Sequence, residues 1–184
     1  MWTIAGSLIV LPATTRTDLL AEPVTAALAA LDPALAARCG VAEIDPELAD
    51  TAAFCQTYGS PLDVSANCVV VAGKRGGDTR YAACVVLATT RADVNGVVRK
   101  RLDVRKASFA PMDDAVERTG MAYGGITPLG LPSDWPLLID SAVAATDEVV
   151  VGSGVRHSKL IVPGELLTKL ASAEVVEGLG RPVG

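Results

Sequence analysis

The chain has 184 residues, of which half are hydrophobic and only 4% aromatic, and its net charge is −5. This length fits one domain with a sizeable core, here built from small and β-branched side chains. The acidic balance argues against tight nonspecific binding to nucleic acid. No apolar run approaches the ~18 residues of a membrane span, and the first twelve residues lack the basic start of a signal peptide. We therefore expect a cytoplasmic protein that does not enter a membrane.

The cysteines and the single histidine show no metal-binding pattern. The four cysteines lie far apart without C-x-x-C spacing, which is typical of free thiols in a reducing compartment. One histidine cannot supply a His-rich metal site. We therefore expect no metal and no cofactor. The cysteines are Cys39, Cys55, Cys68 and Cys84.

The first 59 residues predict an extended arm followed by helices. Leucine and valine at helical spacing behind a capping residue indicate the longest of these helices. Another helix opens at Asp45-Pro46-Glu47, because proline is favoured at the first helical position. In chain order we expect a strand or arm at Trp2–Leu11, helices from Thr17 or Asp18 to Leu31 and at Pro33–Cys39, a strand at Val41–Ile44, and a helix from Asp45 to Tyr58.

The rest of the chain alternates strands and helices. Cys68–Ala72 and Tyr81–Thr89 are β-branched runs around a glycine-rich turn, which predicts a β-hairpin. Ala92–Leu102 has the pattern of an amphipathic helix. We then expect strands at Val104–Phe109, Pro136–Ile139, Glu148–Gly152, Lys159–Val162 and Ala173–Val176, and helices at Pro111–Thr119, Ser141–Ala145 and Pro163–Ala171. This order predicts one α/β domain over residues 1–184, with a mixed, strongly curved, barrel-like sheet and helices outside it.

A glycine- and proline-rich stretch, Tyr123–Gly130, is the clearest candidate for a binding loop. Glycine lets a ligand approach the backbone closely, and proline fixes the backbone angle φ. Such a loop can present N–H groups to a carboxyl, ester or phosphate oxygen. The alternative is a tight connection between two elements.

Familiar catalytic devices are missing from the sequence. A Ser–His–Asp hydrolase would need His157 as base, but the adjacent Ser158 would lie on the opposite face of a strand. No G-x-S-x-G elbow and no phosphate-binding glycine motif is present. The pair Asp113/Asp114 is explained by its place at a helix start. The residues alone therefore indicate an α/β domain with a loop of backbone donors.

The order of motifs resembles the YbaK family, also called the prolyl-tRNA-synthetase-associated domain, over about residues 41–170. Residues 1–40, which we expect to form a strand and helices, precede the stretch that resembles this family. The most specific piece is Gly-Gly-Ile-Thr-Pro-Leu-Gly followed by the Ile139-Asp140 pair. The motifs are Glu43-Ile44-Asp45-Pro46, the hairpin Asn67–Leu87, Asp93-Val94, Met121–Gly130, Leu138-Ile139-Asp140 and Val149–Gly154.

The resemblance implies an aminoacyl-tRNA editing deacylase, in which water attacks the ester that joins an amino acid to the 3′ end of tRNA. Gly124 and Gly125 would polarise the ester through backbone groups. The implied partners are mischarged aminoacyl-tRNA and, as a candidate, an aminoacyl-tRNA synthetase. The chain would act as a monomer or homodimer, without a cofactor. The implied substrate-binding residues are Ile126, Thr127, Pro128, Ser153, Gly154 and Asp140.

Three positions depart from the family pattern. A lysine usual at the start of the first hairpin strand aligns with Asn67, and an aspartate usual in the last glycine-rich segment aligns with Lys159 or a neighbour. A tyrosine before the Glu-x-Asp-Pro piece aligns with Ala42. We therefore predict that Lys159 supplies the cation from the opposite wall of the pocket. The alternatives are a solvated Lys159, and Asn67 binding substrate as a neutral amide.

Several further candidate binding residues can also be explained without a role in binding. Asp140 can cap the helix that starts near Ser141 instead of contacting substrate. The candidate tRNA-binding residues can instead be solvated; they are Lys74, Arg75, Arg99, Arg156 and His157.

Two other functions remain open beside editing. One is a binding module for aminoacyl-tRNA or aminoacyl-adenosine without catalysis, which the loss of the usual lysine favours. The other is a small-molecule ester or amide hydrolase.

Overall fold

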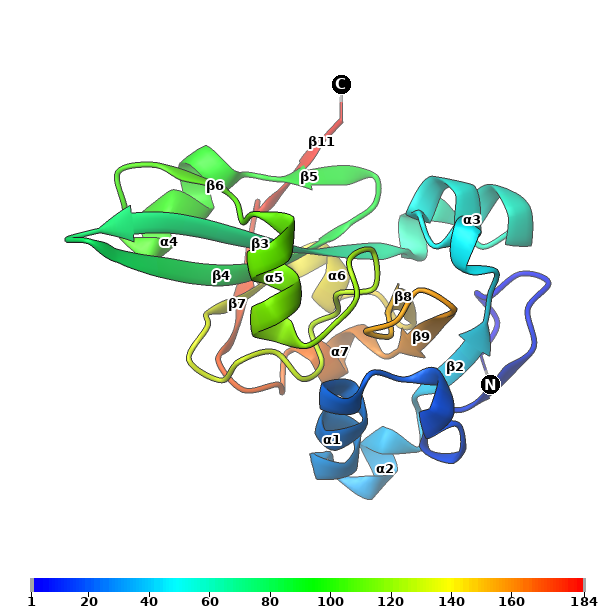
Figure 1. The fold of residues 1–184 in the computed structure, drawn as a ribbon. Coiled ribbons are helices and arrows are strands. Elements are labelled where there is room, and N and C mark those ends of the chain that lie inside the picture. The colour runs from blue at the N-terminus through cyan, green and yellow to red at the C-terminus, as the bar shows by residue number, and fades with distance from the viewer. Residues whose placement is uncertain (1, 184) are drawn as a thin grey trace.

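The computed structural model describes residues 2–183, and its strands form two main sheets and a small third one (Figure 1). Apart from a parallel edge, neighbouring strands run antiparallel. The first sheet has the order β1 (Val10–Pro12), β2 (Gly40–Glu43), β9 (Ser158–Val162), β8 (Val149–Gly152). The second has the order β10 (Ala173–Val176), β7 (Leu137–Asp140), β4 (Asp78–Leu87), β3 (Ala66–Arg75), β6 (Ala107–Phe109). The third pairs β11 (Gly180–Pro182) with β5 (Thr90–Ala92).

The expected mixed sheet is present, because β10, β7 and β4 pair in parallel while β4, β3 and β6 pair antiparallel. The barrel-like closure is not confirmed: within residues 2–183 the strands form separate open sheets. The first two sheets meet at a single bridge, Ser65 to Val150. The long β3–β4 hairpin crosses the molecule and projects beyond the other elements (Figure 1).

Short helices surround these sheets. They are α1 (Glu22–Ala30), α2 (Pro33–Ala36), α3 (Thr51–Tyr58), α4 (Arg99–Leu102), α5 (Met112–Thr119), α6 (Ser141–Ala144) and α7 (Gly164–Leu167). Tighter 3-10 turns cover Ala13–Thr15, Thr17–Leu19, Pro46–Leu48 and Leu62–Val64, and a π-helical turn covers Val94–Val98.

Away from its projecting tip, strand β4 of the hairpin is buried on both faces. Ala83 and Val85 of β4 face the largest core, which also contains residues of α1, β8 and β9. Their neighbours Ala82 and Cys84 face a second cluster that includes Val98, just before α4, and Leu102 at the end of α4. Burial on both faces explains why the strand sequence is a continuous run of small and β-branched residues rather than an alternating pattern.

The predicted helix from Asp45 to Tyr58 is wrong in one consequential respect, because it is broken in the middle. A 3-10 turn ends at Leu48, and α3 starts only at Thr51. Asp50 caps this second start by accepting hydrogen bonds from the N–H groups of Ala52 and Ala53, as an N-cap aspartate does. The break leaves the Ala49 carbonyl outside regular helix, where a side chain can bond it.

Other expected elements are shorter or differ in kind. The N-terminal arm is a strand only at Val10–Pro12, and the first long helix begins at Glu22 after a 3-10 turn. The predicted amphipathic helix at Ala92–Leu102 is a π-helical turn followed by the single turn α4. Asp93 holds this start, because its carboxylate accepts from the N–H groups of Gly96 and Val97.

Candidate functional site

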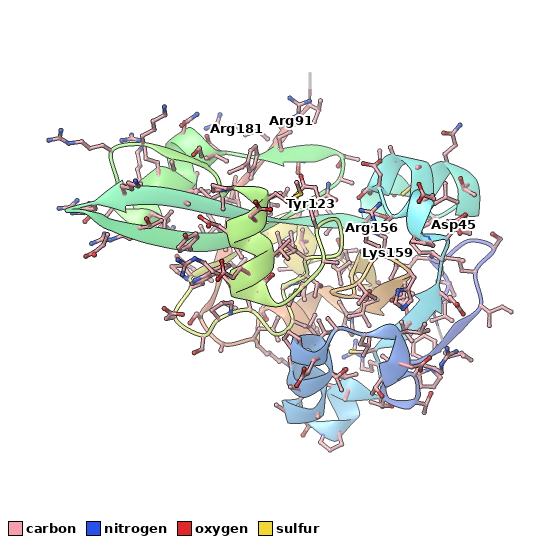
Figure 2. The ribbon with its side chains drawn as sticks, viewed as in Figure 1. Asp45, Arg91, Tyr123, Arg156, Lys159 and Arg181 are labelled. Carbon is pink, nitrogen blue, oxygen red and sulfur yellow. The ribbon has the colours of Figure 1, made fainter. Side chains whose placement is uncertain are left out.

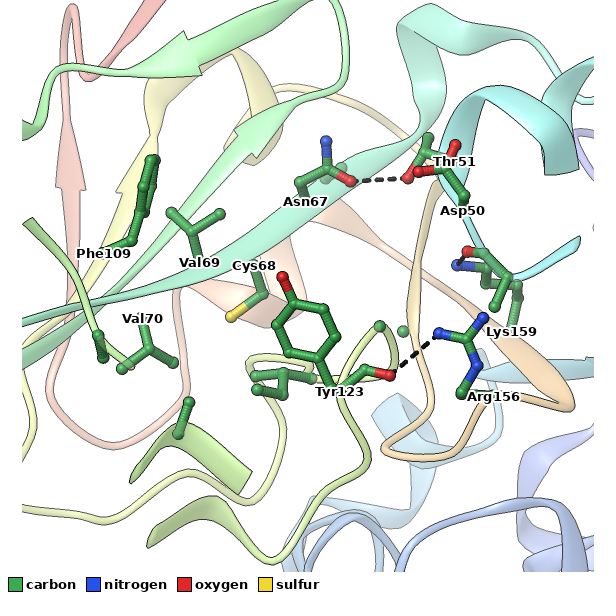
Figure 3. A pocket seen from close by; sticks show the side chains of 17 residues that line it. Asp50, Thr51, Asn67, Cys68, Val69, Val70, Phe109, Tyr123, Arg156 and Lys159 are labelled. Carbon is green, nitrogen blue, oxygen red and sulfur yellow. Dashed lines mark hydrogen bonds between the residues drawn. The ribbon is translucent and has the colours of Figure 1, made fainter. Parts of the chain in front are cut away.

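A cavity of about 490 Å³ opens beside the first half of β3 (Figure 3). Its size is that of ordinary small-molecule sites. Segments far apart in the sequence line it: the start of α3, the edge of β3, the turn after β6, the glycine-rich loop, and the β8–β9 connection. The lining residues are Ala49, Asp50, Thr51, Ala66, Asn67, Cys68, Val69, Val70, Phe109, Ala110, Ala115, Tyr123, Gly124, Ile126, Gly152, Arg156 and Lys159.

The β3 wall of the cavity is an open strand edge. β6 pairs with β3 only at Val71–Gly73, and the isolated bridge of Ser65 to Val150 stands just before β3, so between these two points β3 is paired with β4 alone. Alternate residues of a strand direct their backbone groups to opposite edges. The Ser65 carbonyl bonds Ala88 on the β4 side, and the Val70 carbonyl bonds Ala110 on the other. By this alternation, the N–H and C=O of Cys68 face the cavity and are available to a ligand.

Lys159 forms the opposite wall, where it is only 7% exposed. Its Nζ donates to the Ala49 carbonyl at 2.8 Å and lies 5.5 Å from the centre of the Phe54 ring. Burial lowers the pKa of Lys159, against the opposing influence of Cys55 and Asp50. An ammonium has three donors, so two remain for a ligand after the bond to Ala49. Lys159 lines the same cavity as Asn67 and Gly124.

Asn67 stands across the cavity as a neutral amide (Figure 3). Its Oδ1 accepts a hydrogen bond of 2.7 Å from Thr51 Oγ1. This bond orients the side chain and leaves its NH₂ group as the remaining donor of the amide. Two polar side chains therefore line the cavity from different walls, the ammonium of Lys159 and the amide of Asn67.

The glycine-rich loop uses its two adjacent glycines differently. Gly124 has φ +84°, a conformation that favours glycine, and lines the cavity. Gly125 braces the loop: its N–H donates to Ala122 at 2.9 Å, and its carbonyl accepts from Gly154 at 2.7 Å. The expectation that both glycines donate to a ligand is therefore corrected, because the Gly125 N–H is already bonded. Within residues 2–183, the Gly124 N–H has no backbone or side-chain partner.

Arg156 ties two walls of the cavity together. Its Nη1 donates to the Tyr123 carbonyl at 3.1 Å and its Nη2 to the Pro46 carbonyl at 3.0 Å. The rigid fork of the guanidinium suits such a two-sided contact. Figures 2 and 3 show Arg156 between Tyr123 and Lys159. Its position at the cavity also allows contact with a phosphate, while its neighbour His157 is not among the lining residues.

Ser153 and Gly154 of the β8–β9 connection support the glycine-rich loop and, unlike Arg156 of the same connection, are not among the residues that line the cavity. Ser153 is buried, with its Oγ 3.1 Å from the Ser158 carbonyl and 2.7 Å from Ser158 Oγ. Gly154 packs against Ala21 and bonds the Gly125 carbonyl. The predicted substrate contact of Ser153 and Gly154 is therefore corrected to a supporting position.

Among the other predicted substrate-binding residues, only Ile126 lines the cavity. Thr127 and Pro128 are buried and are not among the lining residues, and the Thr127 hydroxyl has no hydrogen-bond partner within residues 2–183. Asp140 caps α6 by accepting from Ala142 at 2.8 Å, and its second oxygen accepts from Gly180 at 2.6 Å. Its alternative role as a cap is the one that the hydrogen bonds support.

The basic residues of the hairpin are remote from this cavity. Lys74 and Arg75 lie at the far end of β3, and Arg75 bonds Asp103 at 2.5 Å. Arg99 begins α4, and its Nε donates to the Asn95 carbonyl at 2.8 Å. These three residues cannot contact the same small ligand as Lys159.

The sequence did not single out the aromatic rim of the cavity. Tyr123 and Phe109 line it while 58% and 64% exposed. For Tyr123, an aromatic residue directly before a Gly-Gly pair was the available signal. Cys68 also lines the cavity, but burial raises the pKa of its thiol well above the ordinary value. It is therefore not a thiolate nucleophile.

Residues 45–170, about two thirds of the chain, match the sequence profile of the aminoacyl-tRNA editing domain. The chain therefore belongs to this family. A protein assigned as a trans-editing enzyme for prolyl tRNA synthetase has a similar structure, with a TM-score of 0.69 at 20% identity over 86% of this chain and 97% of that one. A scaffold from computational epitope grafting aligns with a TM-score of 0.68 at 20% identity, covering 89% and 100% of the two chains. At such identities the likeness shows a shared fold.

Residues 2–183 lack two further features. No helix there is long and apolar enough to cross a bilayer. No group of three or more histidine, cysteine, aspartate or glutamate side chains there is arranged to hold a metal ion.

Proposed function

We propose that this protein hydrolyses the ester of mischarged aminoacyl-tRNA in trans. The observation that carries the proposal is the meeting of Asn67, Gly124 and Lys159 in one cavity, although they come from three distant parts of the chain. Membership of the editing-domain family supports the reaction class.

The ester would lie between the glycine-rich loop and the β3 edge. Water attacks the ester carbonyl, negative charge develops on its oxygen, and the bond to the ribose oxygen breaks. The products are the free amino acid and a tRNA with its terminal hydroxyl restored. The Gly124 N–H and the Lys159 ammonium are the donors that face this charge, and one such donor is worth about 3–4 kcal/mol of the barrier. Asn67 offers its NH₂ group to a polar atom of the aminoacyl-adenosine.

The exposed aromatic rim fits the nucleoside end of this substrate. Tyr123 stands on the loop and Phe109 at the end of β6, so both rings border the cavity mouth. Base–aromatic stacking contributes about 1–3 kcal/mol per base. Arg156 lies beside the loop with an exposed guanidinium, where it can meet a phosphate of the tRNA 3′ end.

The test is a panel of mischarged tRNAs assayed for release of amino acid. We expect release with at least one of them, and a loss of about 100-fold or more for Lys159→Met, because an oxyanion donor is removed. Lys169→Met is the matched control, since Lys169 is exposed and outside the cavity. Unchanged hydrolysis by Lys159→Met would contradict the assigned role.

A second function, binding without hydrolysis, is favoured by one observation. Asn67 stands where the family usually has lysine, and Thr51 already holds its oxygen. The same panel separates the two functions: tight binding of aminoacyl-tRNA without release of amino acid supports the binding module. Hydrolysis of small esters but of no mischarged tRNA would point to a small-molecule hydrolase.

A further inference from the structure

The charges of this protein are strongly segregated. Residues 73–80 and 99–106 contain eight of its 16 lysines and arginines but only two of its 21 acidic residues, giving this part a net charge of +6. All other residues together carry −11. The two segments form one basic end at the projecting tip of the hairpin, because Arg80 bonds the Leu102 carbonyl at 2.9 Å and Arg75 bonds Asp103. An acidic chain thus carries a local surface suited to a polyanion.

A second hollow, of about 610 Å³, lies within this basic end. Three cations line it, Lys74, Arg105 and Lys106, together with the hydroxyls of Thr79 and Ser108 and one carboxylate, Asp114. Within residues 2–183, none of these three cations forms a salt bridge, whereas Arg75 and Arg80 share Asp103. The cations of the hollow therefore remain available to an external anion.

The hollow continues the groove of the first cavity. Phe109, Ala110 and Ala115 line the cavity, and the adjoining residues Ser108, Pro111 and Asp114 line the hollow. The two depressions also follow each other along β3, from Val70 to Ala72. Lys74 is seven residues beyond Asn67 on that strand, or about 23 Å at ~3.3 Å per residue. A nucleic-acid strand that advances ~3.4 Å per nucleotide spans this distance in about seven nucleotides.

We propose that this hollow binds the phosphate backbone of RNA, about seven nucleotides from the end held in the cavity. The inference rests on the proposed function for the identity of the RNA as an aminoacyl-tRNA. The concave shape favours a nucleic-acid strand over a flat membrane surface. The protein would thus hold the acceptor stem in addition to the terminal nucleotide, and would distinguish whole tRNA from short aminoacyl fragments.

The test compares the binding of two RNA probes that carry no esterified amino acid, measured by fluorescence anisotropy over 50–200 mM salt. One probe is a four-nucleotide 3′ fragment, and the other is a hairpin that includes the acceptor stem. We expect the hairpin to bind at least ten-fold more tightly at 50 mM salt. The double variant Lys74→Glu/Lys106→Glu should lose this advantage, and the slope of log K against log salt should fall by about 0.7–0.9 for each phosphate that the variant no longer neutralises. Its binding of the four-nucleotide probe should stay unchanged.

The matched control is Arg91→Glu/Lys169→Glu, which makes the same charge change at exposed positions outside the hollow. Equal binding of the two probes by the wild type, or equal losses in both double variants, would overturn the proposal. Binding to phosphatidylserine vesicles but not to the hairpin would also overturn it. Because neither probe carries an amino acid, the outcome does not depend on ester hydrolysis. Hairpin binding that disappears only in Lys74→Glu/Lys106→Glu supports RNA binding by the hollow even if the protein does not deacylate tRNA.

Discussion

Gly152→Ala is expected to damage the candidate site more than the fold. Gly152 ends β8 and pairs with Lys159 across the sheet. A Cβ built on Gly152 would lie 2.6 Å from the Gly125 carbonyl oxygen and 2.9 Å from that of Ile126. Ordinary C–H···O contacts need about 3.3 Å, so the loop must retreat by about 0.7 Å. Both obstructing atoms are backbone, which leaves no flexible side chain to absorb the change.

The expected cost has two parts. Overpacking of this kind reduces the free energy of unfolding by about 1–3 kcal/mol. A misplacement approaching 1 Å reduces the rate by up to about 100-fold, because Gly124 would move away from the ester oxygen that we propose it contacts. We therefore expect Gly152→Ala to remain folded at 25 °C and to lose most of its kcat on a mischarged tRNA.

The assay combines urea denaturation with single-turnover deacylation. Gly59→Ala is the control, since Gly59 caps the end of α3 at φ +75° and its added Cβ would meet open space. Forcing alanine into this left-handed conformation costs about 1–2 kcal/mol, a similar loss of stability without displacement of the loop. The reasoning would be refuted if Gly152→Ala had the same kcat as the wild type, or if both variants lost kcat equally.

The remaining predictions concern buried polar groups. The fold lowers the pKa of Lys159 from 10.5, so between the lowered pKa and 10.5 the folded state binds fewer protons than the unfolded chain. Urea unfolding should therefore show wild-type stability rising relative to Lys159→Met as the pH increases through this window, and a constant difference would contradict the assigned shift. Asp140→Ala should lower the free energy of unfolding by about 2–4 kcal/mol, because two backbone N–H groups lose a charged acceptor; the same denaturation assay measures it, and kcat should persist in the folded fraction. Thr127→Val should raise the free energy of unfolding by about 1 kcal/mol, because an unpaired buried hydroxyl is removed, and a loss of stability would show that the hydroxyl has a partner.

The sequence by itself determined the elements that depend on strand preference and turn residues within a short stretch of chain. The β-branched runs around Gly76-Gly77 specified the β3–β4 hairpin, because strand preference and turn chemistry act over a few residues. The run Met121–Gly130 marked the cavity loop, since its glycines permit backbone conformations that other residues resist. The sequence therefore located the loop that carries Gly124, whereas other positions of the matched motifs, such as Ser153 and Asp140, are not among the residues that line the cavity.

Tertiary structure decided which side chains share the cavity. Ala49, Asn67 and Lys159 are separated by up to 110 residues, and only the packing of β9 beside the broken start of α3 brings them together. From the sequence, the carboxylate of Asp140 could contact substrate or cap a helix. In the fold it accepts hydrogen bonds from the backbone N–H groups of Ala142 and Gly180. The basic hollow arose likewise from segments distant in the sequence, which the pairing of β6 with β3 brings side by side. Side-chain chemistry can be read along the chain, but its partners are fixed by long-range packing.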